Sequence, residues 1–361
     1  MLMLFFILCA IILLIFLTGV FFRIYNSLES KIDADLGIQE NTYVTIGGIE
    51  QYLQIRGENK NNPVILWLHG GPGFPLTYLT YYYQIALEKD YTIVCWEQRG
   101  CGRTFYRNKS DNNLIIEQLL ADTDEIIDYL RERFGKDKII IMGQSWGTVL
   151  GMEYINTHPE KVAAYISIGQ VTDFLQGKIY AAESAAQIAA ENGNKEDTEF
   201  LEQCIERLSK TEGIAKLDIK SLEEMIITST KYLKCDGEMS GIKRIFAAIT
   251  SPEMSWNDAR WFLFASDTQN IITFQNNLVD YMYFQFDVMK LSKEYDIPIC
   301  FIQGKSDWIT PTSLVNDYYE VIASDKKEMI VINNAGHTPF LDNPEQFCEA
   351  VKTFLSECKN E

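Results

Sequence analysis

The sequence predicts an α/β fold in which a mostly parallel, doubly wound sheet carries an inserted helical cap and follows an N-terminal transmembrane helix. Three observations support this prediction. Short apolar runs alternate with segments of helical periodicity, the stretch 172–290 is largely helical in pattern, and the first 22 residues contain no charged side chain. We therefore divide the chain into a transmembrane helix (1–22), a linker (23–39), a first core segment (40–171), a cap (172–290) and a second core segment (291–361).

Six short apolar runs are the predicted core strands, because a strand buried on both faces of a parallel sheet carries apolar side chains on both faces. These runs span residues 64–68, 92–96, 139–142, 164–168, 297–302 and 329–332. A β-hairpin that turns at Gly47-Gly48 precedes them. Helical periodicity covers 115–134 and 344–355, and a proline opens the second of these segments. Such alternation of strands and helices is typical of a doubly wound sheet.

The first 22 residues are mostly Leu, Ile and Phe, and about 20 apolar residues are what a helix needs to cross a bilayer. A cleaved signal peptide would carry Lys or Arg before a shorter apolar stretch and a small-residue cleavage site, and neither is clear here. We therefore expect an uncleaved membrane anchor. Arg23 and Lys31 follow the segment and, by the positive-inside tendency, favour a cytoplasmic globular part. Two charges leave the side of the membrane open.

The charge balance and the cysteine pattern exclude several classes of function. A net charge of −18 and a pI near 4.7 disfavour binding to nucleic acid or to an anionic membrane surface. The eight cysteines show no C-x-x-C spacing, so neither a zinc site nor a disulfide framework is indicated, and buried thiols are expected. We expect no metal, no cofactor and no nucleic-acid partner.

The strongest motif is the pentapeptide Gly143-Gln144-Ser145-Trp146-Gly147, a G-x-S-x-G between a predicted strand and a predicted helix. This is the context of the nucleophile elbow of α/β-hydrolases, in which the glycines let the backbone pass close to a strained serine. The alternative is a plain turn in which Ser145 only caps the helix. The context predicts that Ser145 is a nucleophile.

A serine hydroxyl needs a base to accept its proton, and the chain contains three histidines. His158 lies at the end of a predicted helix and His69 at the end of a predicted strand beside glycines, where structural roles are favoured. His337 lies on a loop between the last predicted strand and the last predicted helix. His337 is therefore the predicted base.

The third member of such a site is an acid that orients the imidazole, and in this fold it falls between the serine and the histidine in chain order. Asp307 follows the predicted strand 297–302, at the carboxyl end where such sites gather. Its rivals Asp287, Asp296 and Asp342 do not follow a strand in this way. Asp307 is the predicted acid.

Attack on a carbonyl creates an oxyanion that needs backbone donors. The N–H of Trp146, directly after the nucleophile, is the first candidate. The second lies in His69-Gly70-Gly71-Pro72-Gly73, a loop after the predicted strand 64–68, and Gly71 is the preferred residue. The alternative for this loop is a plain glycine-proline turn.

These motifs together resemble the proline iminopeptidase (prolyl aminopeptidase) family of α/β-hydrolases. The resemblance rests on the loop 69–73, on Trp96-Glu97-Gln98-Arg99-Gly100-Cys101-Gly102-Arg103-Thr104, on the elbow with Thr148, and on Gly304 to Asp307 with Gly336-His337. It covers the segments 40–171 and 291–361 and implies removal of N-terminal residues, often proline, from peptides. The chain departs from the family pattern in two places. Glu97 replaces the usual Asp, and the cap lacks the W-x-x-W-E segment that carries an amine-binding glutamate.

The resemblance implies that carboxylates bind the free amine of the substrate. Glu97 is the first candidate, and the cap acids Glu183, Glu224 and Glu253 are the others. An aminopeptidase acting on short peptides is thus the predicted function. An esterase or other acyl hydrolase with the same triad, acting on a small acyl substrate, is the main alternative, and a catalytically silent binding module is a third.

Overall fold

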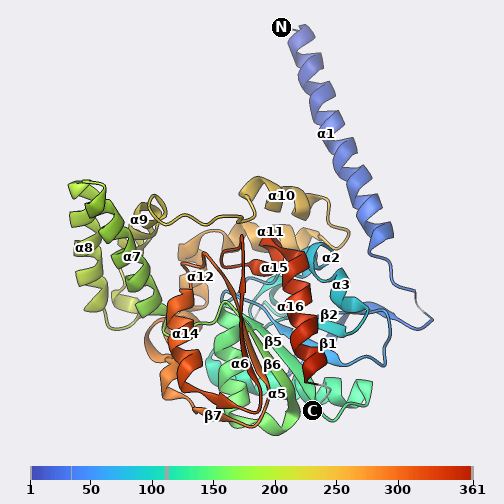
Figure 1. Ribbon diagram of the computed structural model, residues 1–361. Helices are drawn as coiled ribbons and strands as arrows, with labels where there is room; N and C mark the ends of the chain where they lie inside the picture. Colours follow the sequence, from blue (N-terminus) through green and yellow to red (C-terminus); the bar gives the residue numbers. More distant parts are fainter. Residues whose placement is uncertain (1, 34, 110–113, 359–361) are drawn as a thin grey trace.

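A computed structural model describes residues 2–33, 35–109 and 114–358 and shows an eight-stranded sheet with helices on both faces (Figure 1). The strand order is β1-β2-β4-β3-β5-β6-β8-β10. The bounds are β1 Ile38–Ile46, β2 Ile49–Gly57, β3 Val64–Leu68, β4 Thr92–Glu97, β5 Ile139–Gln144, β6 Val162–Ile168, β8 Ile299–Gly304 and β10 Lys327–Ile332. The pairs β1–β2 and β2–β4 are antiparallel and the others are parallel. The predicted mostly parallel sheet is thus confirmed, as is the hairpin, in which Ile46 pairs with Ile49.

The central strands are continuous apolar runs because both of their faces are buried. In β3, Leu66 and Leu68 belong to the core on one face of the sheet, whereas Ile65 and Trp67 belong to the core on the other. The first core is covered by α5 (Ile116–Phe134), α6 (Trp146–Thr157) and α14 (Thr312–Val321), and the second by α2 (Thr80–Tyr83), α3 (Ile85–Glu88), α15 (Pro339–Asp342) and α16 (Pro344–Glu357). Short elements complete this part: η1 Thr77–Leu79, α4 Gly102–Arg107, η2 Pro159–Lys161, and the paired strands β7 Glu294–Tyr295 and β9 Ala323–Ser324.

Between β6 and β7 the chain forms a group of helices over one end of the sheet (Figure 1). They are α7 Phe174–Glu191, α8 Lys195–Ser209, η3 Ile214–Lys216, α9 Ile219–Thr230, α10 Gly241–Ile249, α11 Trp256–Ala265, α12 Thr268–Phe274, α13 Asn276–Asp280, η4 Tyr281–Gln285 and η5 Val288–Lys290. Ala182, Ala185, Leu201 and Trp261 are members of an apolar core that belongs mainly to this region. We refer to residues 172–290 as the cap.

The cap is joined to the sheet through loops that follow strands β3 and β4. The guanidinium of Arg103, in α4, donates to both carboxylate oxygens of Asp258 in α11, with Nη2 2.7 Å from Oδ2. Trp261 Nε1 donates to the carbonyl of Gly73 at 2.7 Å, and Gln275 Nε2 donates to a carbonyl of the loop after β4 at 3.0 Å. These polar contacts fix the position of the cap above the carboxyl ends of the strands.

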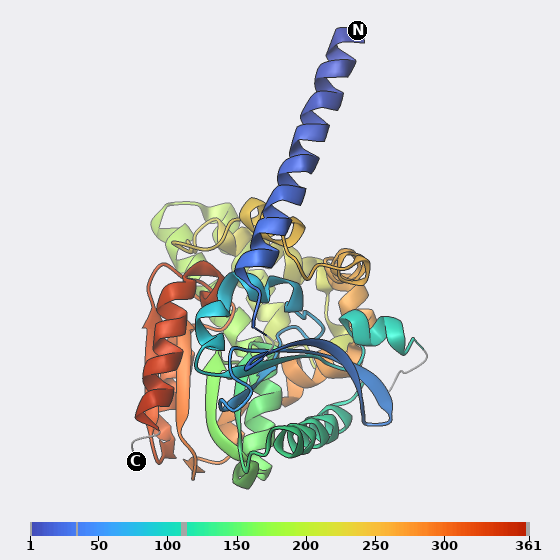
Figure 2. The ribbon, with the colours of Figure 1, turned by 90° about the vertical axis from the view of Figure 1, so that its right-hand side faces the viewer.

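The N-terminal segment forms α1 (Leu2–Glu29), which projects from the rest of the molecule beside α10 (Figures 1 and 2). At its base, Arg23 Nη2 donates to the carbonyl of Met254 at 2.9 Å, and the ring of Phe22 lies 5.5 Å from that of Phe246. Within the described ranges, no helix has the combination of length and apolar character that crossing a membrane requires. The predicted transmembrane helix at 1–22 is therefore not supported.

Candidate active site

Ser145 occupies a sharp turn between β5, which ends at Gln144, and α6, which begins at Trp146. Its backbone has φ 51° and ψ −116°, a strained conformation for a residue with a side chain. The next turn of the chain packs so closely that a Cβ on Gly147 would collide with the carbonyl of Leu68 at the end of β3. The pentapeptide thus adopts the strand, turn and helix arrangement predicted for it, and Ser145 is 7% exposed.

Asp307 and His337 come together from two loops at the same edge of the sheet. Asp307 lies between β8 and α14, and His337 lies between β10 and α15. Oδ2 of Asp307 is 2.9 Å from Nδ1 of His337. Because Nδ1 faces the carboxylate, the other ring nitrogen, Nε2, is the one left to exchange a proton with a substrate or a nucleophile.

Further donors hold the Asp307 carboxylate. The backbone N–H groups of Ile309 and Thr310 each donate to Oδ1 at 2.9 Å, and Thr310 Oγ1 donates to Oδ2 at 2.8 Å. Burial would raise the pKa of Asp307, but the His337 ring and the Thr310 donors outweigh it and lower that pKa below its usual value. The carboxylate therefore stays ionised and able to stabilise a protonated imidazole.

The end of β6 lies between Ser145 and the Asp307–His337 pair and contacts both. Its backbone N–H donates to the carbonyl of Ile168 at 2.9 Å. The following residue, Gly169, lies so close to the pair that a Cβ there would be 3.0 Å from Cε1 of His337 and 3.4 Å from Oδ2 of Asp307. The three predicted residues thus gather at the carboxyl ends of neighbouring strands, although no described hydrogen bond joins the Ser145 hydroxyl to His337.

The two predicted oxyanion donors lie on adjacent strand ends. Trp146 is the first residue of α6, where backbone N–H groups lack partners within the helix. Gly71 lies in the loop after β3, with φ 127°, and β3 is the neighbour of β5 in the sheet. A Cβ on Gly70 would lie 3.3 Å from the Gln144 carbonyl, so this loop packs directly against the elbow.

The other two histidines have structural surroundings. His69 is buried; its Nδ1 lies 2.8 Å from the carbonyl of Gly70, and its Nε2 accepts from the N–H of Gln98 at 3.2 Å. His158 stacks on Tyr154 at the end of α6, with ring centroids 4.9 Å apart. Within the described ranges, no group of three or more His, Cys, Asp and Glu side chains is arranged to hold a metal ion.

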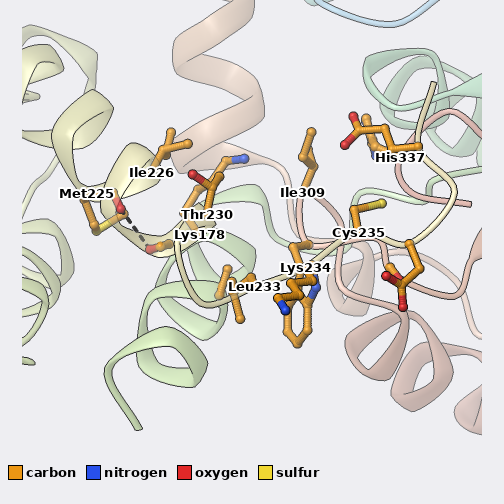
Figure 3. A pocket seen from close by; sticks show the side chains of 15 residues that line it. Lys178, Met225, Ile226, Thr230, Leu233, Lys234, Cys235, Ile309 and His337 are labelled. Carbon is orange, nitrogen blue, oxygen red and sulfur yellow. Dashed lines mark hydrogen bonds between the residues drawn. The ribbon is translucent and has the colours of Figure 1, made fainter. Parts of the chain in front are cut away.

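A cavity of about 530 Å³ opens between the cap and the Asp307–His337 pair (Figure 3). His337, Ser306, Trp308 and Ile309 line it from the loops of the sheet. The cap contributes the remaining lining residues, which are Lys178, Ala181, Met225, Ile226, Ser229, Thr230, Leu233, Lys234, Cys235, Asp236 and Glu238. Ser145 is not among the lining residues, so the cavity reaches the site from the histidine side.

None of the four carboxylates predicted to bind an amine lines this cavity. Glu97 is fully buried and accepts from Thr77 Oγ1 and from the backbone N–H of Arg103, each at 2.5 Å. Glu183 and Glu224 are exposed, and Glu253 accepts from a side chain of β1. The placement of Glu97 differs from expectation because its carboxylate is directed into the Arg103 network that holds the cap.

Several site residues were not predicted from the sequence. Thr310 positions Asp307, and Lys178, Trp308, Asp236 and Glu238 line the cavity. One signal was available for Lys178, which falls in the apolar helical stripe formed by Phe174, Ala181, Ala182 and Ala185. A lysine in such a stripe is either buried or directed into a cavity. Asp236 and Glu238 lie in a loop, where no helical or strand periodicity indicates toward which side a side chain points.

Comparisons with known proteins agree with the observed fold. The model of the alpha/beta hydrolase fold family matches residues 63–344. The probable aminopeptidase YbaC of Bacillus subtilis (strain 168) is 27% identical over 85% of this chain and 93% of its own length. The proline iminopeptidase of Lactobacillus helveticus (strain DPC 4571) is 25% identical over 86% and 95% of the two chains. The crystal structure of a proline iminopeptidase-related protein from Thermus thermophilus superposes with a TM-score of 0.56 at 20% identity, covering 88% and 98%. Because the family match spans most of the chain, this protein belongs to the alpha/beta hydrolase fold family, and it resembles the proline iminopeptidases.

Proposed function

We propose that the protein is a serine aminopeptidase of the proline iminopeptidase type, which releases N-terminal residues from short peptides. The observation that carries this proposal is the contact between Asp307 and His337 beside the strained turn of Ser145. The two relatives named aminopeptidase and proline iminopeptidase, which align over most of the chain, support the substrate class.

In the proposed mechanism, the Ser145 hydroxyl attacks the carbonyl carbon of the N-terminal residue while its proton passes to Nε2 of His337. Asp307 stabilises the imidazolium that forms. The backbone N–H groups of Trp146 and Gly71 bind the oxyanion of the tetrahedral intermediate. The C–N bond then breaks, the leaving amine takes the proton from His337, and water hydrolyses the acyl-enzyme through the same steps.

An aminopeptidase also has to bind the protonated amine of its substrate. Asp236 and Glu238 are the acidic side chains that line the cavity, and both belong to the cap. We assign amine binding to this pair in place of Glu97, whose carboxylate is already bound to Thr77 and Arg103. Asp236→Asn and Glu238→Gln should each raise KM for substrates with a free N-terminal amine.

The test is a panel of proline, alanine and leucine p-nitroanilides with their N-acetylated counterparts and short-chain p-nitrophenyl esters. We expect the free-amine anilides to be preferred over their acetylated counterparts. Ser145→Ala should lower kcat by about a millionfold, and His337→Ala nearly as much, because triad members act as a unit. His158→Ala is the matched control and should leave kcat unchanged. A Ser145→Ala enzyme within tenfold of the wild type would contradict the proposal.

An esterase with the same triad is the second candidate. It is favoured by the apolar cap side chains of the cavity, among them Met225, Ile226 and Leu233, and because the lining includes none of the four glutamates predicted to bind an amine. Equal turnover of the acetylated anilide and the free amine, together with faster turnover of the esters, would support this candidate over the peptidase.

We also propose that the protein is attached to a membrane through α1. Side chains that this helix exposes include Leu14, Phe16 and Phe21, at 65%, 63% and 64%. They continue into exposed apolar residues of α10, where Ile242 is 83% exposed. Burial of such a surface in the interfacial region of a bilayer removes apolar area from water.

A further inference from the structure

Lys178 is a buried cation in the cavity. It lies in α7, is 9% exposed, and lines the same cavity as His337 (Figure 3). Its Nζ lies 4.5 Å above the ring of Phe174. Among the described residues, no hydrogen bond or ion pair is formed by this ammonium group. A buried ammonium without an anion is unfavourable, so the arrangement calls for a partner that enters the cavity.

Asp307 does not supply that partner. Burial lowers the pKa of Lys178 to about 8, and the negative charge of Asp307 opposes this effect, so the ammonium form still prevails at pH 7. The carboxylate of Asp307, however, already accepts from Ile309, Thr310 and His337. Its attraction keeps Lys178 charged but does not provide it with a hydrogen-bonding acceptor.

A second buried donor of the cavity also lacks a hydrogen-bond acceptor among the described residues. Nε1 of Trp308 is buried and has no hydrogen-bond partner among the described residues, and Trp308 also lines the cavity. An indole N–H only donates, and so does an ammonium group. The acidic residues of the cavity, Asp236 and Glu238, are exposed instead. Lys178 and Trp308 are therefore buried donors of the lining, whereas its two carboxylates are exposed to solvent.

We propose that Lys178, assisted by the Trp308 indole, binds a carboxylate of the substrate. This inference rests on the proposed peptidase function and narrows its substrate to peptides that carry a carboxylate close to the scissile bond. Di- and tripeptides with a free C-terminus meet that requirement, and a cavity of about 530 Å³ has the size of a typical small-ligand site. A charge-assisted hydrogen bond to the carboxylate would satisfy the buried ammonium.

The experiment compares three substrates that share the same N-terminal residue: Ala-Ala, its C-terminal amide Ala-Ala-NH2, and Ala-Glu-NH2. Release of free alanine gives kcat/KM for each, counted as two alanines per turnover for Ala-Ala and one for each of the two amides. We expect Ala-Ala to be cleaved faster than Ala-Ala-NH2. Ala-Glu-NH2 distinguishes the C-terminal carboxylate from a side-chain carboxylate, since only the side chain is charged at that end.

In Lys178→Met, which removes the charge and keeps an unbranched side chain one atom shorter, the ratio of kcat/KM for Ala-Ala to that for Ala-Ala-NH2 should fall at least about 30-fold. Lys178→Arg should retain part of the preference. The ratio is measured within one enzyme preparation, so a loss of folded protein does not change it. Lys220→Met is the matched control, because Lys220 lies on the cap with its side chain 85% exposed, and its ratio should equal that of the wild type.

Binding to the Ser145→Ala protein separates this inference from the proposed function. Calorimetry should show that Ala-Ala binds more tightly than Ala-Ala-NH2 and that Lys178→Met removes the difference. Equal binding of the two ligands, or an unchanged ratio in Lys178→Met, would overturn the role of Lys178 even if peptides are cleaved. Carboxylate-dependent binding without any peptide cleavage would support the subsite and refute the peptidase function.

Discussion

Oδ2 of Asp307 lies 2.9 Å from Nδ1 of His337, and Thr310 donates to the same carboxylate. The contact orients the imidazole and places a carboxylate beside the ring. Asp307→Asn should therefore lower kcat by about 10⁴-fold, because an amide neither fixes the correct tautomer nor balances the imidazolium charge. Steady-state kinetics on the anilide or ester substrate that the wild type cleaves best will measure this loss.

Asp287→Asn is the matched control for that change. Asp287 also lies between Ser145 and His337 in the sequence, but its carboxylate accepts from the N–H of Met289 at the start of η5. We expect activity close to that of the wild type. If Asp287→Asn proved the more damaging of the two substitutions, the assignment of the acid would be wrong.

We expect the buried ion pairs of Arg103 to contribute to the stability of the fold. Arg103 is bound to Asp258, and its Nε lies 3.8 Å from Glu97; both carboxylates are buried. Arg103→Met leaves two buried carboxylates without their cation, which should lower the free energy of unfolding by about 3–5 kcal/mol. Urea denaturation followed by circular dichroism measures the change.

Arg107→Met tests whether burial is the cause. Arg107 lies on the same helix and pairs with Glu50 at 2.7 Å, but both side chains are about half exposed. Exposed pairs of this kind are screened by solvent and contribute little to stability, so this substitution should destabilise the protein much less than Arg103→Met. Equal destabilisation by the two substitutions would mean that the Arg103 network does not hold the cap to the core.

The sequence was informative where the chemistry depends on topology. Ser145, Asp307 and His337 each follow a strand, and the carboxyl ends of parallel strands meet at one edge, so their proximity could be predicted. The cap follows no comparable rule. Its helices pack through an Ala-rich surface, and only the folded arrangement directs Lys178 into the cavity. The sequence could not show that the carboxylate of Glu97 faces Arg103 instead of the substrate. This arrangement depends on the pairing of Arg103 with Asp258, which lies 155 positions further along the chain.

Removal of residues 1–22 should leave activity unchanged. The remaining part of α1 keeps the bonds from Arg23 to the Met254 carbonyl and from Asn26 to the Thr250 carbonyl. The Asp307–His337 pair lies in loops after β8 and β10, far along the chain from α1. We expect kcat within twofold of the full chain, and a shift of the protein from the membrane fraction to the supernatant after cell lysis.

Two results would contradict this prediction. A truncated protein that no longer folds would show that the first 22 residues pack against the domain and stabilise it. A full-length chain found in the supernatant would remove the proposal of membrane attachment, whatever the activity of the truncated form.

Because His69 is buried as a neutral ring, we expect the protein to lose stability in acid. Its Nε2 accepts from the N–H of Gln98 and lies 3.3 Å from Sγ of Cys101, so the ring is held as the neutral tautomer with its proton on Nδ1 facing Gly70. Burial lowers the pKa of His69 to about 4, below the ordinary value of 6.5. The unfolded chain therefore binds the proton more readily than the native one between pH 6.5 and pH 4. Stability is fully present above pH 6.5 and is lost as the pH falls through this window.

From pH 7 to pH 4.5 this one residue should lower the free energy of unfolding by about 2 kcal/mol, in proportion to the difference between its two pKa values. His69→Gln should abolish that contribution, so its stability should fall less steeply with acid than that of the wild type, even if it is lower at pH 7. Urea denaturation of the wild type and of His69→Gln at both pH values compares the slopes. Parallel slopes for the wild type and His69→Gln would mean that His69 binds its proton as readily in the native protein as in the unfolded chain, which would overturn the prediction.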